Sequence, residues 1–233
     1  MAVDDYVLVR GLRDTRGALA RWNDDPWPVL RRWFAGALGV AVVLLCAVWF
    51  VSSTVVPDPT PLSLPGLTRP AAPGDVAYVL FRNSLVLALH AMACVAGFIA
   101  GSSLPLTAAR RRGISRRIHE LARPIAIGWV IAVTCFSLTT QAYIIGSNGA
   151  TLAHQLHIST GVLMLTVIPH AVPELVALFL PLAAWTIASR RDEWGDLLAA
   201  TFATVAIAIP MLVVAATWEV YGWPTLLRAV SPG

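Results

Sequence analysis

The sequence predicts an all-α fold, a polytopic membrane bundle of about five transmembrane helices whose fourth span is broken by prolines. Three observations predict it. Of the 233 residues, 57% are hydrophobic and only 13% are charged, whereas soluble domains carry about 25% charged residues. The mean hydropathy is +0.70, and long apolar runs recur along the chain. The arginines gather between alternate runs. This composition excludes an ordinary soluble enzyme, a disordered tail and a disulfide-stapled secreted module.

A membrane span requires roughly 20 mostly apolar residues. Five stretches meet this requirement or come close, and we expect each to be a transmembrane helix. They are 33–56, 79–105, 124–146, 156–189 and 197–221. The first thirty residues carry charges of both signs and no apolar core, so we do not expect a signal peptide there.

The distribution of arginine predicts the topology. Six arginines lie in 1–32, six in 106–123 and two in 190–196, but only one each in 57–78 and 222–233. Short basic loops remain on the cytoplasmic side of a membrane. We therefore expect a multi-pass protein of the bacterial inner membrane, with a cytoplasmic N-terminal segment and an extracytoplasmic C-terminal tail.

The basic loop 106–123 has two interpretations. Its arginines can set the topology and attract anionic lipid, at about 1 kcal/mol per residue near the surface, or they can dock a protein partner. Nucleic acid is not expected, because the loop lacks base-stacking aromatic residues. The lipid or partner contacts are assigned to Arg110, Arg111, Arg112, Arg116 and Arg117.

Two segments outside the spans have their own patterns. Residues 6–20 alternate apolar side chains with arginines, which predicts a short amphipathic helix on the inner membrane surface. Residues 57–78 are rich in proline and glycine, which predicts an extended extracytoplasmic loop with no helix.

Ionisable residues inside a span are costly, by ~2.5–3.5 kcal/mol for Arg, Lys or Asp at its centre. Four such residues occur here: His90, His170, Glu174 and Glu219. We expect them to form a buried polar core together with Asn83. His170 and Glu174 are four residues apart and share one face of an unbroken helix. They can form a hydrogen-bonded pair that fixes packing, line a transport pathway, or bind a metal together with His90.

Pro169 and Pro173 flank His170 within the fourth span. Neither proline has an N–H to donate, so the carbonyls of Leu165 and Pro169 lose their helical partners. We therefore expect the fourth helix to break near the middle of the membrane, as helices do at transporter substrate sites.

Enzyme signatures are weak in this chain. The three cysteines lie in apolar runs without metal-ligand spacing. The run that starts at His170 lacks the second histidine of a zinc protease, and neither a Gly-x-Ser-x-Gly elbow nor a nucleotide-binding Gly-x-x-x-x-Gly-Lys loop is present. We therefore expect no catalytic residue, no metal and no cofactor. Gly97 and Gly101 form a Gly-x-x-x-Gly pattern, which permits close packing within the chain or against a partner.

The run Ile168-Pro169-His170-Ala171-Val172-Pro173-Glu174-Leu175 resembles the signature of the stage II sporulation protein M family of integral membrane proteins. Asn83-Ser84, the run from Gln141 to Gly146, and Glu219 follow the order of that family's other motifs across residues 79–225. Ala171 replaces the family's usual glycine, Ser84 its second asparagine and Gln141-Ala142 its Asn-Gly, and Pro173 is an additional proline. The resemblance implies a membrane scaffold that recruits partners.

The function expected from these observations is a non-enzymatic subunit or scaffold of an inner-membrane complex, embedded in lipid and bound to other subunits or to a second copy. The alternatives are a permease-like transport subunit that works with a partner ATPase and, much less favoured, an intramembrane metal-dependent hydrolase.

Overall fold

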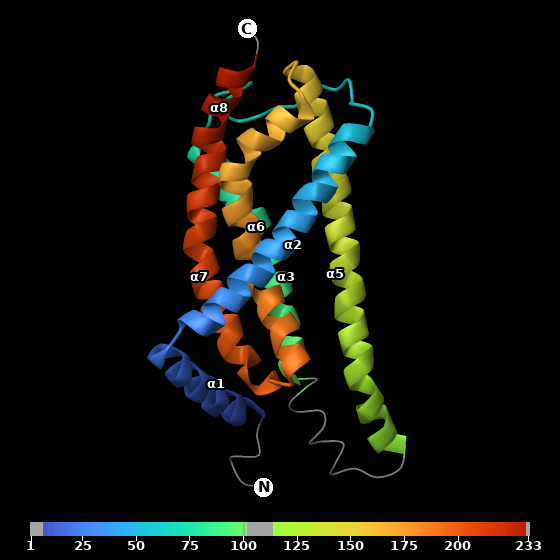
Figure 1. The fold of residues 1–233 in the computed structure, drawn as a ribbon, viewed down its shortest axis with the longest axis vertical. Coiled ribbons are helices and arrows are strands. Elements are labelled where there is room, and N and C mark those ends of the chain that lie inside the picture. The colour runs from blue at the N-terminus through green and yellow to red at the C-terminus, as the bar shows by residue number, and fades with distance from the viewer. Residues whose placement is uncertain (1–6, 100, 102–113, 232–233) are drawn as a thin grey trace. The chain divides into compact units, whose positions relative to one another are not determined.

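The computed structural model describes residues 7–99, 101 and 114–231, most of which are helical (Figure 1). The elements in chain order are α1 (Val7–Asp24), α2 (Trp27–Thr54), α3 (Pro73–Phe98), α5 (Ile114–Gln155), α6 (Thr160–Arg191), the 3₁₀ turn η3 (Trp194–Asp196), α7 (Leu197–Thr217), the π-helical turn η4 (Trp218–Gly222) and α8 (Trp223–Val230). Among the described residues, five helical segments are long and apolar enough to cross a membrane. The chain is therefore an all-α, multi-pass membrane protein.

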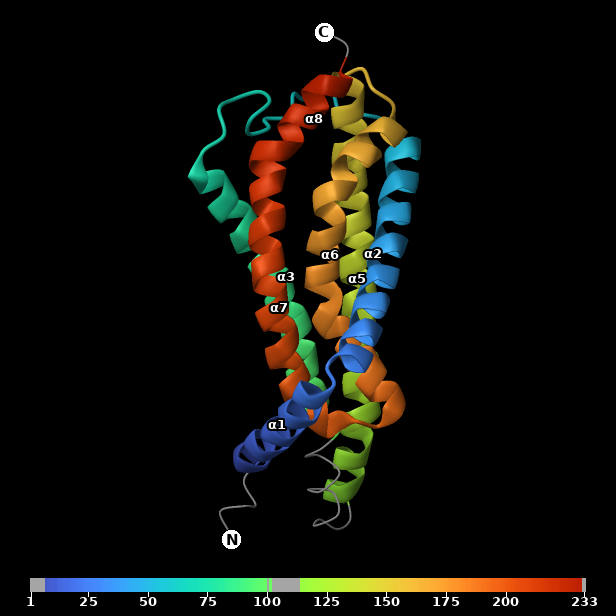
Figure 2. The same ribbon diagram turned by 60° about the vertical axis from the view of Figure 1, so that its left-hand side comes forward.

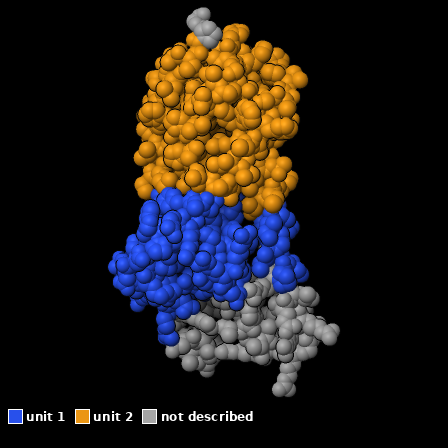
Figure 3. Space-filling view, viewed as in Figure 1, with its two compact units in different colours: residues 1–37, 86–133, 178–208 blue, residues 38–85, 134–177, 209–233 orange. Residues whose placement is uncertain are grey.

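The chain divides into two compact units (Figure 3). Unit 1 contains residues 1–37, 86–133 and 178–208. Unit 2 contains residues 38–85, 134–177 and 209–233. Each long helix therefore contributes one part of its length to unit 1 and another to unit 2.

Several predicted boundaries were wrong. Residues 73–78, expected in a loop, form the start of α3, because a proline in the first helical turn loses no hydrogen bond. Residues 147–155, expected between spans, continue α5. The expected C-terminal tail contains α8, which turns away from α7 after η4 (Figure 2). Of the predicted contact arginines, Arg110–Arg112 lie outside the described residues, and Arg116 and Arg117 belong to the start of α5.

The predicted break in the fourth span was also wrong. The α6 helix is continuous from Thr160 to Arg191, across both Pro169 and Pro173. Its residues from Leu175 to Trp185 are all buried. Membrane helices tolerate proline where neighbouring elements compensate the freed backbone groups. Pro169 is exposed and Pro173 half-buried, and the buried turns that follow them anchor α6 against its neighbours.

In unit 1, α1 packs on its neighbours through a glycine. A Cβ atom at Gly11 would lie 2.8 Å from Leu198 and 3.3 Å from Phe98, so the α1 backbone approaches both side chains closely. The Arg21 guanidinium also donates to both carboxylate oxygens of Asp196, at 2.8 and 2.9 Å. The amphipathic helix predicted at 6–20 is thus present, and it docks on the chain's own helices.

The Gly-x-x-x-Gly pattern, with Gly97 in α3 and Gly101 just beyond its end, serves packing within unit 1. A Cβ at Gly97 would lie 2.7 Å from Nε1 of Trp185, and one at Gly101 would collide with the ring of Trp194. The two glycines therefore make room for two tryptophans of the same chain.

In unit 2, α2 and α5 meet at Gly146. The Ser52 hydroxyl donates to the Gly146 carbonyl at 2.9 Å. A Cβ at Gly146 would lie 2.6 Å from the Cβ of Val51 and 2.9 Å from the carbonyl oxygen of Val48. Neither atom is the free end of a flexible side chain, so this contact requires glycine.

We expect Gly146→Ala to lower the free energy of unfolding by about 1–3 kcal/mol, because overpacking forces the backbones apart. The matched control is Gly128→Ala in the same helix, where nothing lies within 4 Å of the added methyl group. Unfolding with a denaturing detergent measures both variants. Equal stability of the two variants would contradict the close α2–α5 contact.

Candidate functional site: a polar cluster around Glu174

Unit 2 brings three of the predicted site residues together. Asn83 lies on α3, Glu174 on α6 and Glu219 on η4. The Glu174 carboxyl interacts electrostatically with Glu219, Arg82 and the Asn83 side chain. Asn83 is buried and both carboxyls are half-buried. We call these three residues with Arg82 the polar cluster.

The polar cluster is incompletely paired. The Nδ2 atom of Asn83 faces Glu174, yet it forms no hydrogen bond of normal geometry with any described residue. The exposed Arg82 guanidinium attracts both carboxyls electrostatically but forms no close ion pair with either. It lies 5.9 Å from the ring centroid of Tyr78. The arrangement offers carboxyl and amide oxygens that can accept hydrogen bonds from a cationic or protonated group.

Glu219 is placed by a local irregularity of the backbone. Residues Trp218–Gly222 form a π-helical turn between α7 and α8. Such turns contain one more residue per hydrogen-bonded ring than an α-helix, and they occur frequently at functional sites. The π-helical turn therefore shifts the helical register at Glu219, the residue whose carboxyl enters the polar cluster.

His170 lies in unit 2 but does not pair with Glu174. Its ring is buried against Trp223, with centroids 5.3 Å apart. No hydrogen-bond partner for its Nδ1 atom exists among the described residues. The Trp223 indole N–H in turn donates to the Thr166 hydroxyl at 3.1 Å. The predicted His170–Glu174 hydrogen bond is therefore wrong, and the imidazole serves as an aromatic packing partner between α6 and α8.

His90 belongs to unit 1, and its part in a shared polar core with His170 and Glu174 is not observed. Its Nδ1 atom lies 2.8 Å from the Leu178 carbonyl oxygen, and it donates because a carbonyl can only accept. One turn further along α3, the Cys94 thiol donates to the Pro181 carbonyl at 3.1 Å. These two bonds connect α3 to α6. Among the described residues, no three metal-ligating side chains gather in one place.

Three contributors were missed by sequence reasoning. Arg82 was not among the residues expected in the polar core, although its position next to Asn83 was a usable signal. Trp223 was assigned to no site, and Cys94 was placed only in an apolar run. The sequence contains no local signal for either contact, because the partners lie 53 and 87 positions away along the chain.

No family model matches the chain, and neither a curated protein nor a solved structure matches it. The resemblance to the stage II sporulation protein M family therefore stays a prediction.

The packing role of His170 is tested by a pair of substitutions. We expect His170→Phe to preserve or raise stability, because phenylalanine keeps the ring contact with Trp223 and removes the unpaired nitrogen. His170→Ala should lower the free energy of unfolding by about 2 kcal/mol or more, because it leaves a cavity. Thermal unfolding in detergent compares them. If both variants are equally destabilised, the nitrogen itself is required and the packing role is refuted.

Proposed function

We propose that this chain is a non-enzymatic subunit or scaffold of a bacterial inner-membrane complex, with its N-terminus in the cytoplasm. The resemblance described above favours this role, and one observation carries it: a polar seam on the surface of α5. This helix is the least buried of the five candidate spans. Only 11% of the residues in its span are buried, against 39% in the α6 span.

The α5 seam consists of residues at alternating steps of three and four, all in unit 2. They are Thr134, Ser137, Gln141, Ile144 and Asn148. This is the spacing with which one helix packs along another. Every member is half-buried or exposed, and all but Ile144 are polar.

The seam is not the face by which α5 attaches to its own chain. That attachment uses Ala142, Gly146 and Ala150, which recur at steps of four and are buried. Gly146 accepts the hydrogen bond from Ser52 of α2. On a helix these residues point away from the seam, so this attachment does not use the seam. Within the seam, Ile144 and Asn148 are exposed.

Acyl chains cannot hydrogen-bond to the α5 seam. Within the lone chain, the Gln141 amide donates to the Ser137 hydroxyl at 3.0 Å, but the amide oxygen of Gln141 gains no partner from lipid. Small and polar side chains at this spacing are typical of interfaces between membrane helices. A subunit interface is therefore the environment that this face fits best.

The double variant Ser137→Ala/Gln141→Leu tests the interface. We expect it to weaken association by about three- to tenfold, because interhelical hydrogen bonds contribute ~0.6–2 kcal/mol. The apparent mass of the complex extracted from native membranes, and the recovery of its other subunit, measure this loss. The two residues bond to each other, so their joint removal leaves no orphaned group in the chain itself.

Its matched control is Cys135→Ala/Thr139→Val, two exposed α5 residues off the seam and also one turn apart. This control should leave the apparent mass unchanged. A wild-type chain that is monomeric in native membranes, or equal behaviour of the two double variants, would refute the proposed interface.

A second candidate function, a permease-like transport subunit working with a partner ATPase, is favoured by the polar cluster. Two carboxyls and an incompletely paired amide inside candidate spans are expensive to keep, and such groups commonly mark ion or substrate pathways. The π-helical turn that carries Glu219 is consistent with this role.

For transport, Glu174→Gln should abolish flux in reconstituted vesicles while the complex still assembles, because the amide keeps the shape of the side chain but cannot bind and release a proton. The control is Asp25→Asn, at an exposed carboxyl outside the candidate spans. Retained flux in Glu174→Gln would exclude the polar cluster from a transport pathway.

A further inference from the structure

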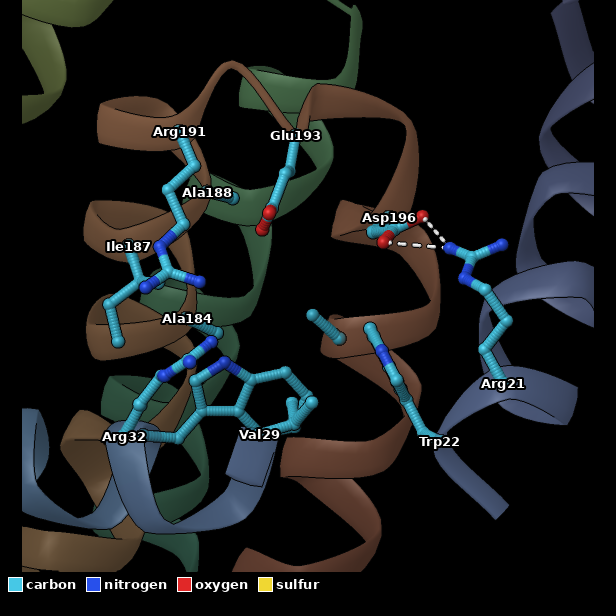
Figure 4. Close-up of a pocket in the computed structure, with 12 residues that line it drawn as sticks. Arg21, Trp22, Val29, Arg32, Ala184, Ile187, Ala188, Arg191, Glu193 and Asp196 are labelled. Carbon is cyan, nitrogen blue, oxygen red and sulfur yellow. Dashed lines mark hydrogen bonds and ion pairs between the residues drawn. The ribbon is translucent and has the colours of Figure 1, made fainter. Parts of the chain in front are cut away.

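A cavity of about 210 Å³ lies within unit 1, where the first turns of α2 and the last turns of α6 meet η3 (Figure 4). The volume is smaller than the ~300–1,000 Å³ typical of sites for drug-sized ligands. Three arginines line it: Arg21, Arg32 and Arg191. Only one of them is neutralised, because Arg21 binds Asp196 at 2.8 Å.

Arg32 and Arg191 therefore share one hollow without an ion pair of their own, although the Glu193 carboxylate also lines it. In Figure 4, Arg32 from α2 and Arg191 from α6 extend toward the same space. Neither forms an ion pair or a hydrogen bond with any of the residues that the structure describes. Two like charges directed at one hollow repel each other unless an anion lies between them.

Topology alone does not account for this arrangement. Basic residues at the cytoplasmic ends of spans follow from the positive-inside rule, and Arg31 and Arg190 satisfy that rule equally well. Those two arginines are also exposed, yet they do not line the cavity. The convergence of Arg32 and Arg191 is thus a property of the cavity and not of the basic segment as a whole.

The rest of the lining indicates the nature of the ligand. Trp22 of α1 and Trp33 of α2 both line the cavity and stand edge to face, with centroids 5.1 Å apart. Val29 and Ile187 add apolar wall. Tryptophan at the end of a span is typical of the headgroup level of a membrane. Arginine pairs favour phosphate, because the planar guanidinium donates two parallel hydrogen bonds to its oxygens.

We infer that this cavity binds the phosphodiester headgroup of an anionic glycerophospholipid, with Arg32 and Arg191 as its phosphate ligands. Free phosphate has the same charge chemistry, but it does not use the apolar wall. A lipid places its headgroup at the guanidinium groups and its glycerol and upper chain carbons against Val29 and Ile187. The carboxylate of Glu193 also faces the hollow and opposes the anion (Figure 4).

The test uses the full chain purified in neutral detergent, with native mass spectrometry to measure retention of added phosphatidylglycerol. Arg32→Gln/Arg191→Gln should weaken binding at least about tenfold, because each charge-assisted hydrogen bond is among the strong ones. The matched control Arg31→Gln/Arg190→Gln removes the same charge from the same helix ends. It should remain within about twofold of the wild type, because Arg31 and Arg190 do not line the cavity.

A variant that gains binding distinguishes an effect on the cavity from misfolding of the chain. Glu193→Gln removes the opposing charge and should tighten phosphatidylglycerol binding about two- to fivefold, a change that an unfolded chain cannot produce. Equal losses in the two double-arginine variants would mean diffuse attraction, and no loss in Arg32→Gln/Arg191→Gln would mean an empty cavity. Either result overturns the inference.

A further arm distinguishes the two phosphate sources. Inorganic phosphate at millimolar concentration should not displace the lipid, because it lacks the apolar part of the ligand. Displacement by inorganic phosphate at the concentration where phosphatidylglycerol itself saturates would assign the site to a soluble phosphate and overturn its assignment to lipid.

Discussion

The structure of unit 1 depends on how α3 and α6 satisfy each other's polar groups. His90 and Cys94, one turn apart on α3, both donate to carbonyls of α6, at Leu178 and Pro181. The middle of α6 is buried on every side, so side chains of neighbouring helices, and not water or lipid, meet its backbone there. Each such bond is worth ~0.6–2 kcal/mol inside a membrane, but two at consecutive turns also fix the register between the helices. The close approach of Trp185 to Gly97 of α3, and of Trp194 to Gly101 just beyond α3, depends on that register.

The ionisable groups of unit 2 are not paired with carbonyls of a neighbouring helix in this way. Its histidine, His170, is buried as an aromatic ring against Trp223. Its carboxyls, Glu174 and Glu219, are half-buried beside an asparagine whose amide lacks a normal partner. A buried polar group that is left unpaired costs about 1–3 kcal/mol. The unpaired amide adds nothing to packing stability, whereas a ligand, a proton or a partner side chain that bonds to the polar cluster would offset this free-energy cost.

Hydropathy was sufficient to predict the five spans, because about 20 apolar residues admit no other arrangement in a bilayer. Local rules then failed wherever tertiary contacts intervened. Counting missing donors predicted a break at Pro169 and Pro173, but burial of the neighbouring turns kept α6 continuous. Spacing placed His170 and Glu174 on one face, yet their partners come from α8 and α3. A spacing rule describes one helix, whereas the partner of a side chain is a property of how helices pack.

The α5 seam and the cavity at Arg32 share one physical property: in the lone chain, both leave polar or charged groups without full partners beside an apolar environment. A soluble protein would hydrate such groups. A membrane protein cannot do so within its spans, and each unpaired group therefore specifies the chemistry of what meets it. The neutral amide and hydroxyls of the seam lie along a helix at helix-packing spacing, which is why we propose another helix as their partner. The two guanidinium groups lie at helix ends beside tryptophans, so they specify an anion at the membrane surface. Protein and lipid would thus recognise different parts of the chain through different chemistry.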